Sequence, residues 1–198
     1  MDSPSDRPKI RSRQALREEL SHFLYEAKRW SQSDDESRRR TGAESLRSAL
    51  QTFRKQPWDS YIFGGLLRDL AYYGAYSAFP RDLDIVVNNE SIDAIADAFG
   101  KSEEDRNRFG GLALDFDGWK VDIWALKETW AFKQQPSFFK GAKAIEALPK
   151  TTFLNVEAIA VELNPSPGQA RKIYEHKFFD ALRQQTLDIN FEVNPYPD

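Results

Sequence analysis

The chain contains no cysteine and only two histidines among its 198 residues. Without cysteine there is no disulfide framework, no thiolate zinc site and no thiol nucleophile. His22 and His176 lie far apart in the sequence, which argues against a histidine-rich metal site. No apolar run approaches the roughly 20 residues of a membrane span, and the first residues, MDSPSDRPKIRSR, lack the apolar stretch of a signal peptide. We therefore expect a cytoplasmic protein with no membrane partner.

What the sequence does contain is typical of a folded globular protein. Hydrophobic residues make up 40% of the chain and aromatic residues 13%, which is the composition of folded rather than disordered chains. A chain of this length usually forms one domain, or one domain with an appendage, and buries roughly 70% of the surface that it exposes when unfolded.

The charge is distributed unevenly along the chain. Residues 1–55 carry thirteen lysines and arginines against nine acidic residues, whereas residues 56–198 carry fifteen against twenty-two. We interpret the first segment as a basic arm with a helical extension, and the second as the main domain. The basic segment could contact a nucleic acid or a protein partner, although a solvated helix face is the commoner explanation. The acidic main domain predicts that a phosphate-rich ligand needs metal ions or local basic residues.

Apolar periodicity and turn residues predict short helices mixed with short strands. Helices are expected over residues 13–30, 45–53, 66–74, 91–100 and 177–185. Strands are expected over residues 60–63, 83–87, 112–116, 119–126, 152–154, 158–163, 172–174 and 187–191. The Asp-Gly pair at 117–118 is typical of a hairpin turn. Together these elements predict an α+β, or mixed α/β, fold.

The most informative stretch begins FGGLLRD. A strand that runs into Gly64 and Gly65 and then into a helix leaves bare backbone N–H groups at the start of that helix. This arrangement suits the oxygens of a phosphate. Arg68, one turn into the helix, could add a cation that binds phosphate through two hydrogen bonds.

Three aspartates lie within apolar strands downstream of this turn. Asp82 and Asp84, in RDLDIVV, are two residues apart and therefore lie on the same face of a strand. Asp122 lies between two β-branched residues in WKVDIW. Such acids are costly unless a hard cation compensates them, so we expect the three to converge. Two Mg²⁺ ions, or Mn²⁺, held there would stabilise the attacking and leaving oxygens of a phosphoryl transfer.

The ordered set GG, RD, DLDIVV and VDIW resembles the DNA-polymerase-β-like nucleotidyltransferase superfamily. More narrowly, it resembles the head domain of bacterial poly(A) polymerases and CCA-adding tRNA nucleotidyltransferases, over roughly residues 58–191. The resemblance implies a mixed sheet flanked by helices. It also implies that Gly64 and Gly65 hold the triphosphate of a nucleotide such as ATP, and that the three aspartates bind two Mg²⁺. Arg68 and Asp69 match the family's Arg-Asp pair.

The resemblance weakens toward the end of the chain. The segment FLNVEAIAVEL at 153–163 is similar to the family's DFTINAL segment beside the nucleotide sugar, but Asn155 stands in place of the Thr and Glu157 in place of the Asn. In the relatives a helical neck that selects the base follows the head, whereas this sequence stops after NPYP. We therefore expect a head-only transferase that acts on RNA or tRNA, a protein or a small molecule.

Two hypotheses of different classes follow. The first is a Mg²⁺-dependent nucleotidyltransferase that moves a nucleoside monophosphate to an acceptor hydroxyl and releases pyrophosphate. The alternative is a catalytically silent, antitoxin-like binding or regulatory subunit with residues 1–55 as its partner surface. Trp119, Trp124 and Trp130 lie close to the third aspartate in the sequence and could stack a base, although core packing is the more common use of tryptophan.

Overall fold

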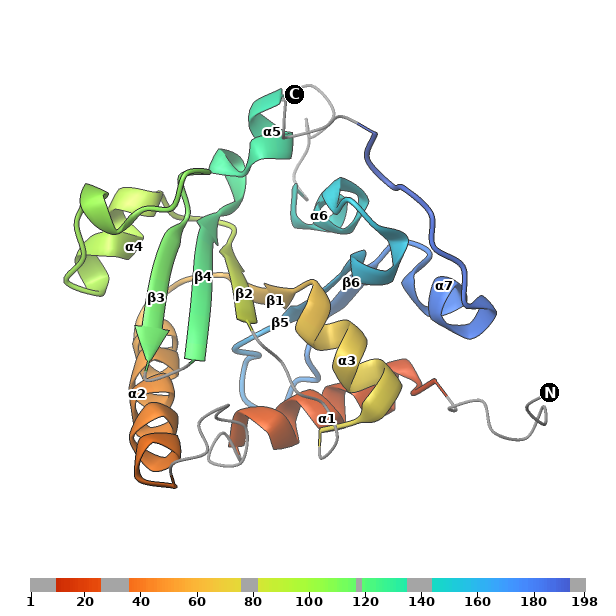
Figure 1. Cartoon of the computed structure of the whole chain (residues 1–198), viewed down its shortest axis with the longest axis horizontal. Helices are drawn as coiled ribbons and strands as arrows, with labels where there is room; N and C mark the ends of the chain where they lie inside the picture. The colour runs from red at the N-terminus through yellow and green to blue at the C-terminus, as the bar shows by residue number, and fades with distance from the viewer. Residues whose placement is uncertain (1–9, 26–35, 76–81, 117–118, 135–143, 193–198) are drawn as a thin grey trace.

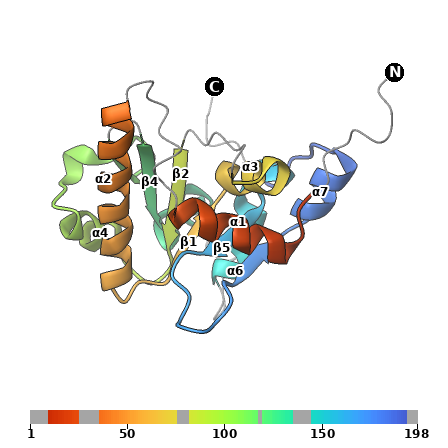
Figure 2. The same cartoon turned by 90° about the horizontal axis from the view of Figure 1, so that it is seen from below.

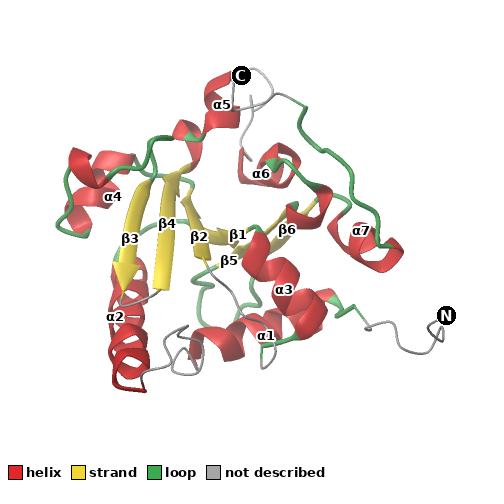
Figure 3. Ribbon diagram, in the orientation of Figure 1, coloured by secondary structure: helices red, strands yellow, loops and turns green. Residues whose placement is uncertain are grey.

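The structure is a computed structural model that describes residues 10–25, 36–75, 82–116, 119–134 and 144–192. Its centre is a six-stranded sheet in the order β3-β4-β2-β1-β5-β6 (Figure 1). The strands are β1 (Ser60–Phe63), β2 (Asp82–Val87), β3 (Leu112–Phe116), β4 (Trp119–Ala125), β5 (Ile159–Glu162) and β6 (Ile173–Glu175). Strands β2 and β4 pair in parallel, and the other neighbours pair antiparallel. The mixed sheet with flanking helices confirms the predicted α+β class (Figure 3).

Seven α-helices and three short 3₁₀ helices lie around this sheet in the described part of the chain. The α-helices are α1 (Arg13–Tyr25), α2 (Glu36–Lys55), α3 (Gly65–Tyr73), α4 (Ile92–Ala98), α5 (Trp130–Gln134), α6 (Ala144–Thr151) and α7 (Phe178–Gln184). The 3₁₀ helices are η3 (Glu103–Asp105), η4 (Leu126–Glu128) and η6 (Asn155–Glu157). Among the described helices none combines the length and apolar character that crossing a membrane requires.

Most predicted elements are present, with several corrections. Helix α2 begins nine residues before the predicted start, because its first turns are polar and show no apolar periodicity. Residues 26–30, predicted as the end of the first helix, lie outside the described residues. The strands predicted at 152–154 and 187–191 are wrong, since a single bridge between Leu154 and Ile189 is formed there. The short helices α5 and α6 were not predicted, and tertiary packing of their apolar side chains explains them.

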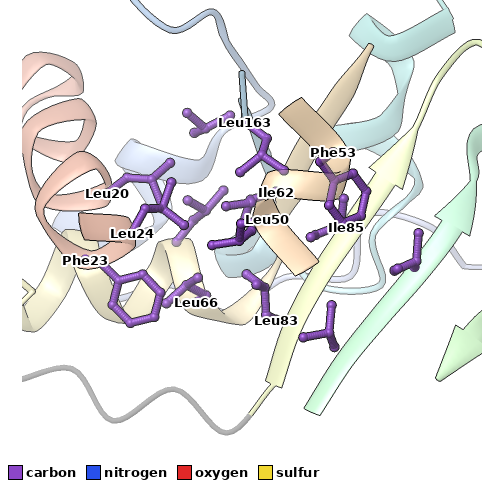
Figure 4. Close-up of a cluster of buried hydrophobic side chains, with 14 of the residues drawn as sticks. Leu20, Phe23, Leu24, Leu50, Phe53, Ile62, Leu66, Leu83, Ile85 and Leu163 are labelled. Atoms are coloured by element: carbon purple, nitrogen blue, oxygen red, sulfur yellow. The ribbon is translucent and has the colours of Figure 1, made fainter. Parts of the chain in front are cut away.

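The strand residues alternate between the two faces of the sheet. One face carries the larger core, in which side chains of α1, α2, α3, α4 and α7 pack on apolar residues of the strands. Figure 4 shows part of it, with Leu20 and Phe23 of α1 and Phe53 of α2 beside Ile62 and Ile85 of the sheet. The opposite face carries a smaller core formed with α5 and α6.

The N-terminal helices contribute directly to the larger core. In Figure 2, α1 lies beside α3, and α2 lies against the sheet at β4. The ring of Phe23 packs edge-on against Trp119 of β4, with centroids 5.7 Å apart, and Trp119 is only 2% exposed. Trp119 is therefore a core residue. The division of the chain at residue 55 stays a prediction.

Candidate active site

The turn between β1 and α3 has the form expected from its two glycines. Gly64 has φ of 79°, a left-handed conformation that favours glycine, and Gly65 begins the helix. A Cβ added at Gly64 would lie 3.6 Å from Oδ2 of Asp84. The turn therefore brings bare backbone directly to the acidic strand β2. The first N–H groups of α3 have no partner within the helix, which makes them available to an anion.

The three aspartates lie on one face of the sheet, the face opposite the larger core. Leu83 and Ile85 of β2 point into that core, so the alternation of the strand directs Asp82 and Asp84 to the other side. In the parallel pairing of β2 with β4, Asp84 is the register partner of Asp122. Asp82 is exposed, whereas Asp84 and Asp122 are only partly exposed.

The environment of Asp84 disfavours its ionised form. Burial first, and then the neighbouring charges of Asp122, Asp82 and Glu157, together raise the pKa of its carboxyl to about 7. The indole of Trp124 acts in the opposite direction and lowers this pKa, although its N–H does not complete a hydrogen bond. Burial also raises the pKa of Asp122. The site therefore gathers carboxyl groups whose ionisation is disfavoured.

Arg68 is bound between two carboxylates. Its Nε donates to Oδ1 of Asp69 at 2.9 Å and its Nη1 donates to Oε1 of Glu157 at 3.0 Å. Its Nη2 lies over Gly65, 3.5 Å from the position that a Cβ would take there. Two of the guanidinium's edges are thus occupied within the protein, while the third faces the glycine turn.

A pocket of about 390 Å³ opens at this place. It is lined by the glycine turn, by part of the acidic cluster and by the segment around η6, that is by Phe63, Gly64, Gly65, Leu66, Arg68, Asp69, Asp82, Asp84, Thr152, Phe153 and Glu157. Asp122 does not line the pocket itself, but it is the register partner of Asp84, which does. Of the residues proposed from sequence, the structure therefore brings Gly64, Gly65, Arg68, Asp82 and Asp84 to one pocket with Asp122 adjacent.

A loop before β3 supports Asp122 and was not recognised in the sequence. The Asn107 side chain donates to Oδ1 of Asp122 at 3.4 Å, and its own oxygen accepts from the backbone N–H groups of Phe109 and Gly111. Gly111 packs against Trp124, since a Cβ there would lie 2.7 Å from the indole ring. The Gly-Gly pair at 110–111 was the available signal, because close backbone approach requires glycine.

Asn155 and Glu157, the two departures from the family segment, have different surroundings. Asn155 is 2% exposed, and its side chain donates to the carbonyl of Thr186 and accepts from the N–H of Asp188. These hydrogen bonds of the Asn155 side chain link η6 to the segment that follows α7. Glu157 lines the pocket and pairs with Arg68.

The donor set fits divalent Mg²⁺ in its chemistry. Carboxylate oxygens are the ligands that Mg²⁺ prefers, and the raised pKa of Asp84 indicates negative charge that a cation would relieve. Among the described residues no three acidic, histidine or cysteine side chains are drawn together closely enough to form a ready metal centre. The three aspartates thus share a face, and Asp84 and Asp122 share a register position, without closing around one point.

No family model and no curated protein matches the sequence, but its fold matches solved structures. A CCA-adding enzyme in complex with CTP aligns with a TM-score of 0.53 at 16% identity, over 86% of this chain and 36% of that chain. A Thermotoga maritima CCA-adding enzyme complexed with tRNA aligns with a TM-score of 0.52 at 17% identity, over 86% and 35%. A CCA-adding enzyme with ATP gives 0.52 at 16% identity, over 86% and 35%.

The chain has a polymerase-β-like nucleotidyltransferase fold. It spans about a third of the length of these solved structures, and at such identities the likeness establishes the fold alone. Within this fold, the aspartates of β2 and β4 lie on one face of the sheet, beside the glycine turn.

Proposed function

We propose that the protein is a Mg²⁺-dependent nucleotidyltransferase that moves a nucleoside monophosphate from a nucleoside triphosphate to an acceptor hydroxyl. One observation carries the proposal: Asp82 and Asp84 on β2 and Asp122 on β4 face the same side of the sheet, across a glycine turn at the start of α3. Acidic strands beside a phosphate-accepting turn suit phosphoryl transfer better than any other common reaction.

The residues of the chain divide the work by their chemistry. Gly64 shapes the turn, and its own N–H donates to the carbonyl of Ile159 at 3.4 Å. The backbone N–H groups that begin α3 at Gly65 donate to the phosphate oxygens, and the edge of Arg68 that faces the turn adds positive charge. The three aspartates would hold two Mg²⁺ ions, which supply charge stabilisation for the attacking and leaving oxygens. Asp122 completes the site on the side of the acceptor.

The reaction balances without a redox step or a further reactant. The acceptor oxygen forms a bond to the α-phosphorus as the bond from that phosphorus to the pyrophosphate oxygen breaks, and the hydroxyl proton leaves to water. RNA, including tRNA, is our first expectation for the acceptor because the compared CCA-adding enzymes were solved in complex with CTP and with tRNA. A protein or a small molecule stays an alternative.

Product formation tests the proposal directly. The protein is incubated with Mg²⁺ or Mn²⁺, each labelled nucleoside triphosphate in turn, and either total RNA or cell-extract protein. Asp84→Asn is expected to abolish labelling. Asp115→Asn is a matched control, since Asp115 lies on the outer strand β3, is exposed and belongs to a similar Asp-x-Asp pair.

Two results would contradict the proposal. Equal labelling by wild type and Asp84→Asn would show that the acidic cluster does not carry the reaction. No label and no pyrophosphate with any nucleotide would favour the alternative, a catalytically silent binding or regulatory subunit. In that case the next step would be to search for a protein partner that binds the exposed face of α1, because the other face of this helix is buried in the core.

A further inference from the structure

Phe153 is an exposed aromatic side chain within the pocket. It is 49% exposed and lines the pocket together with the glycine turn and Glu157. The other phenylalanine of the lining, Phe63, packs against the smaller core. Phe153 is therefore an aromatic ring in the pocket wall that stays accessible to a ligand. Several of its neighbours in the lining are acidic residues or glycines, which cover little of its apolar surface.

The backbone around Phe153 is held by the chain that follows α7. Its carbonyl accepts from the N–H of Asn190 at 2.9 Å, and the next residue, Leu154, forms the bridge to Ile189. Asn155 follows, with its buried amide bonded to two backbone groups of the chain after α7. A ring on a backbone anchored in this way loses little conformational freedom when a ligand covers it.

The polar groups beside Phe153 are already engaged. The Thr152 hydroxyl donates to the carbonyl of Pro149 at 3.0 Å and accepts from Nδ2 of Asn190 at 3.3 Å. The Glu157 carboxylate accepts from Arg68. Among the described residues, this wall therefore offers a ligand the face of a ring and few free hydrogen-bonding groups.

We propose that Phe153 is the stacking platform for the nucleobase of a nucleotide whose phosphates lie at Gly64 and Gly65. This inference rests on the proposed function and adds a base subsite to it. Every base has a π-face, so stacking holds all four bases with similar strength, whereas discrimination requires hydrogen bonds to the base edges. The subsite therefore binds purine and pyrimidine nucleotides with similar affinity.

Equilibrium binding separates this subsite from the phosphate site. Wild type, Phe153→Ala, Phe153→Tyr and Tyr73→Ala are titrated with ATP, CTP, GTP, UTP and inorganic tripolyphosphate in the presence of Mg²⁺. Phe153→Ala is expected to weaken the binding of all four nucleotides by roughly 5- to 150-fold, the range for loss of one base–aromatic stack, and to leave tripolyphosphate binding unchanged. Phe153→Tyr keeps an aromatic ring at this position and is therefore expected to keep the wild-type affinity for all four nucleotides.

Tyr73→Ala serves as the matched control, because Tyr73 is 55% exposed at the end of α3 and is not part of the pocket lining. Thermal melts confirm that each variant is folded. Unchanged nucleotide binding by Phe153→Ala, or an equal loss of tripolyphosphate binding, overturns the base subsite. A wild-type preference above tenfold for one base also overturns it. Absence of tripolyphosphate binding to wild type instead overturns the proposed function, and the subsite with it.

Discussion

Asp84 of β2 and Asp122 of β4 are register partners on adjacent parallel strands, and both point away from the larger core. Two partly buried carboxylates in this relationship oppose each other's ionisation. The pKa of Asp84 is raised to about 7 by burial first and by Asp122 second. The pair is thus a source of instability in the metal-free protein and the natural place for a cation.

The first prediction concerns stability against pH. The pKa of Asp84 is about 7 in the folded state against an ordinary value of 3.8, so between these pH values the folded protein keeps a proton that the unfolded chain loses. The free energy of unfolding therefore falls as pH rises through this window and levels off above it. Asp84→Asn removes this contribution, which is at most about 4 kcal/mol. Denaturant unfolding in EDTA at pH 5, 6 and 8 measures it. Parallel pH profiles for the two proteins would contradict the assignment.

The second prediction concerns metal binding. Above pH 7 the acidic cluster is ionised, so Mg²⁺ is expected to raise the melting temperature of the wild type, since a ligand that binds only the folded state stabilises it. Asp84→Asn is expected to lose most of this increase. Sodium chloride at matched ionic strength controls for screening. Equal Mg²⁺-dependent increases in wild type and variant would place the ion elsewhere.

The third prediction concerns the loop that supports Asp122. Asn107→Ala leaves the N–H groups of Phe109 and Gly111 without their acceptor, which is expected to cost about 1–3 kcal/mol. Asn107→Asp keeps an acceptor but places a second carboxylate beside Asp122. The Asp variant is therefore expected to be near wild-type stability at pH 5 and to lose stability at pH 8. Chemical unfolding of both variants at pH 5 and pH 8 measures these changes in stability. A loss of stability in Asn107→Asp that is the same at both pH values would argue against contact with Asp122.

The fourth prediction compares two glycines. An alanine Cβ at Gly111 would lie 2.7 Å from the Trp124 ring, so Gly111→Ala is expected to displace the indole and cost about 1–3 kcal/mol. At Gly65 the nearest atom to a Cβ is 3.5 Å away on the flexible Arg68 side chain. Gly65→Ala is therefore expected to change stability by less than about 1 kcal/mol. Thermal unfolding with tryptophan fluorescence compares them, and an equal effect of both would contradict the packing described.

The fifth prediction concerns helix α1. Leu20 is fully buried in the core that α1 shares with the sheet, so Leu20→Ala is expected to cost about 2–5 kcal/mol. Glu18→Ala, on the exposed face of the same helix, is expected to change stability by less than about 0.5 kcal/mol. Denaturant unfolding tests both. A negligible effect of Leu20→Ala would contradict the contribution of α1 to the larger core.

Much of the site could be predicted because the signals involved are local. Gly64 and Gly65 predict the turn through the conformational freedom of glycine, and the structure has this turn, with φ of 79° at Gly64. The two-residue spacing of Asp82 and Asp84 predicts one face because side chains alternate along a strand. Ser91 predicts the start of α4, where its side chain accepts from the N–H of Ala94.

Other features depend on segments far apart in the sequence. Nothing near Asp122 indicates that β4 pairs in parallel with β2 instead of ending as an exposed hairpin. The two carboxylates that bind Arg68 come from its neighbour Asp69 and from Glu157, 89 residues away. The predicted strands around Leu154 and Ile189 have suitable residues, but only one bridge forms between them.

The sequence by itself thus determined the glycine turn, the shared face of Asp82 and Asp84, and the hairpin of β3 and β4. Short-range sterics and side-chain alternation are enough for each of these. The convergence of the aspartates was expected, but the tertiary structure alone decided that parallel pairing of β2 with β4 brings Asp122 beside Asp84. It also decided that Arg68 is bound between two acids and that Phe153 opens into the pocket. Strand order and the contents of a pocket follow from how the whole chain buries its apolar surface, and no single segment carries that information.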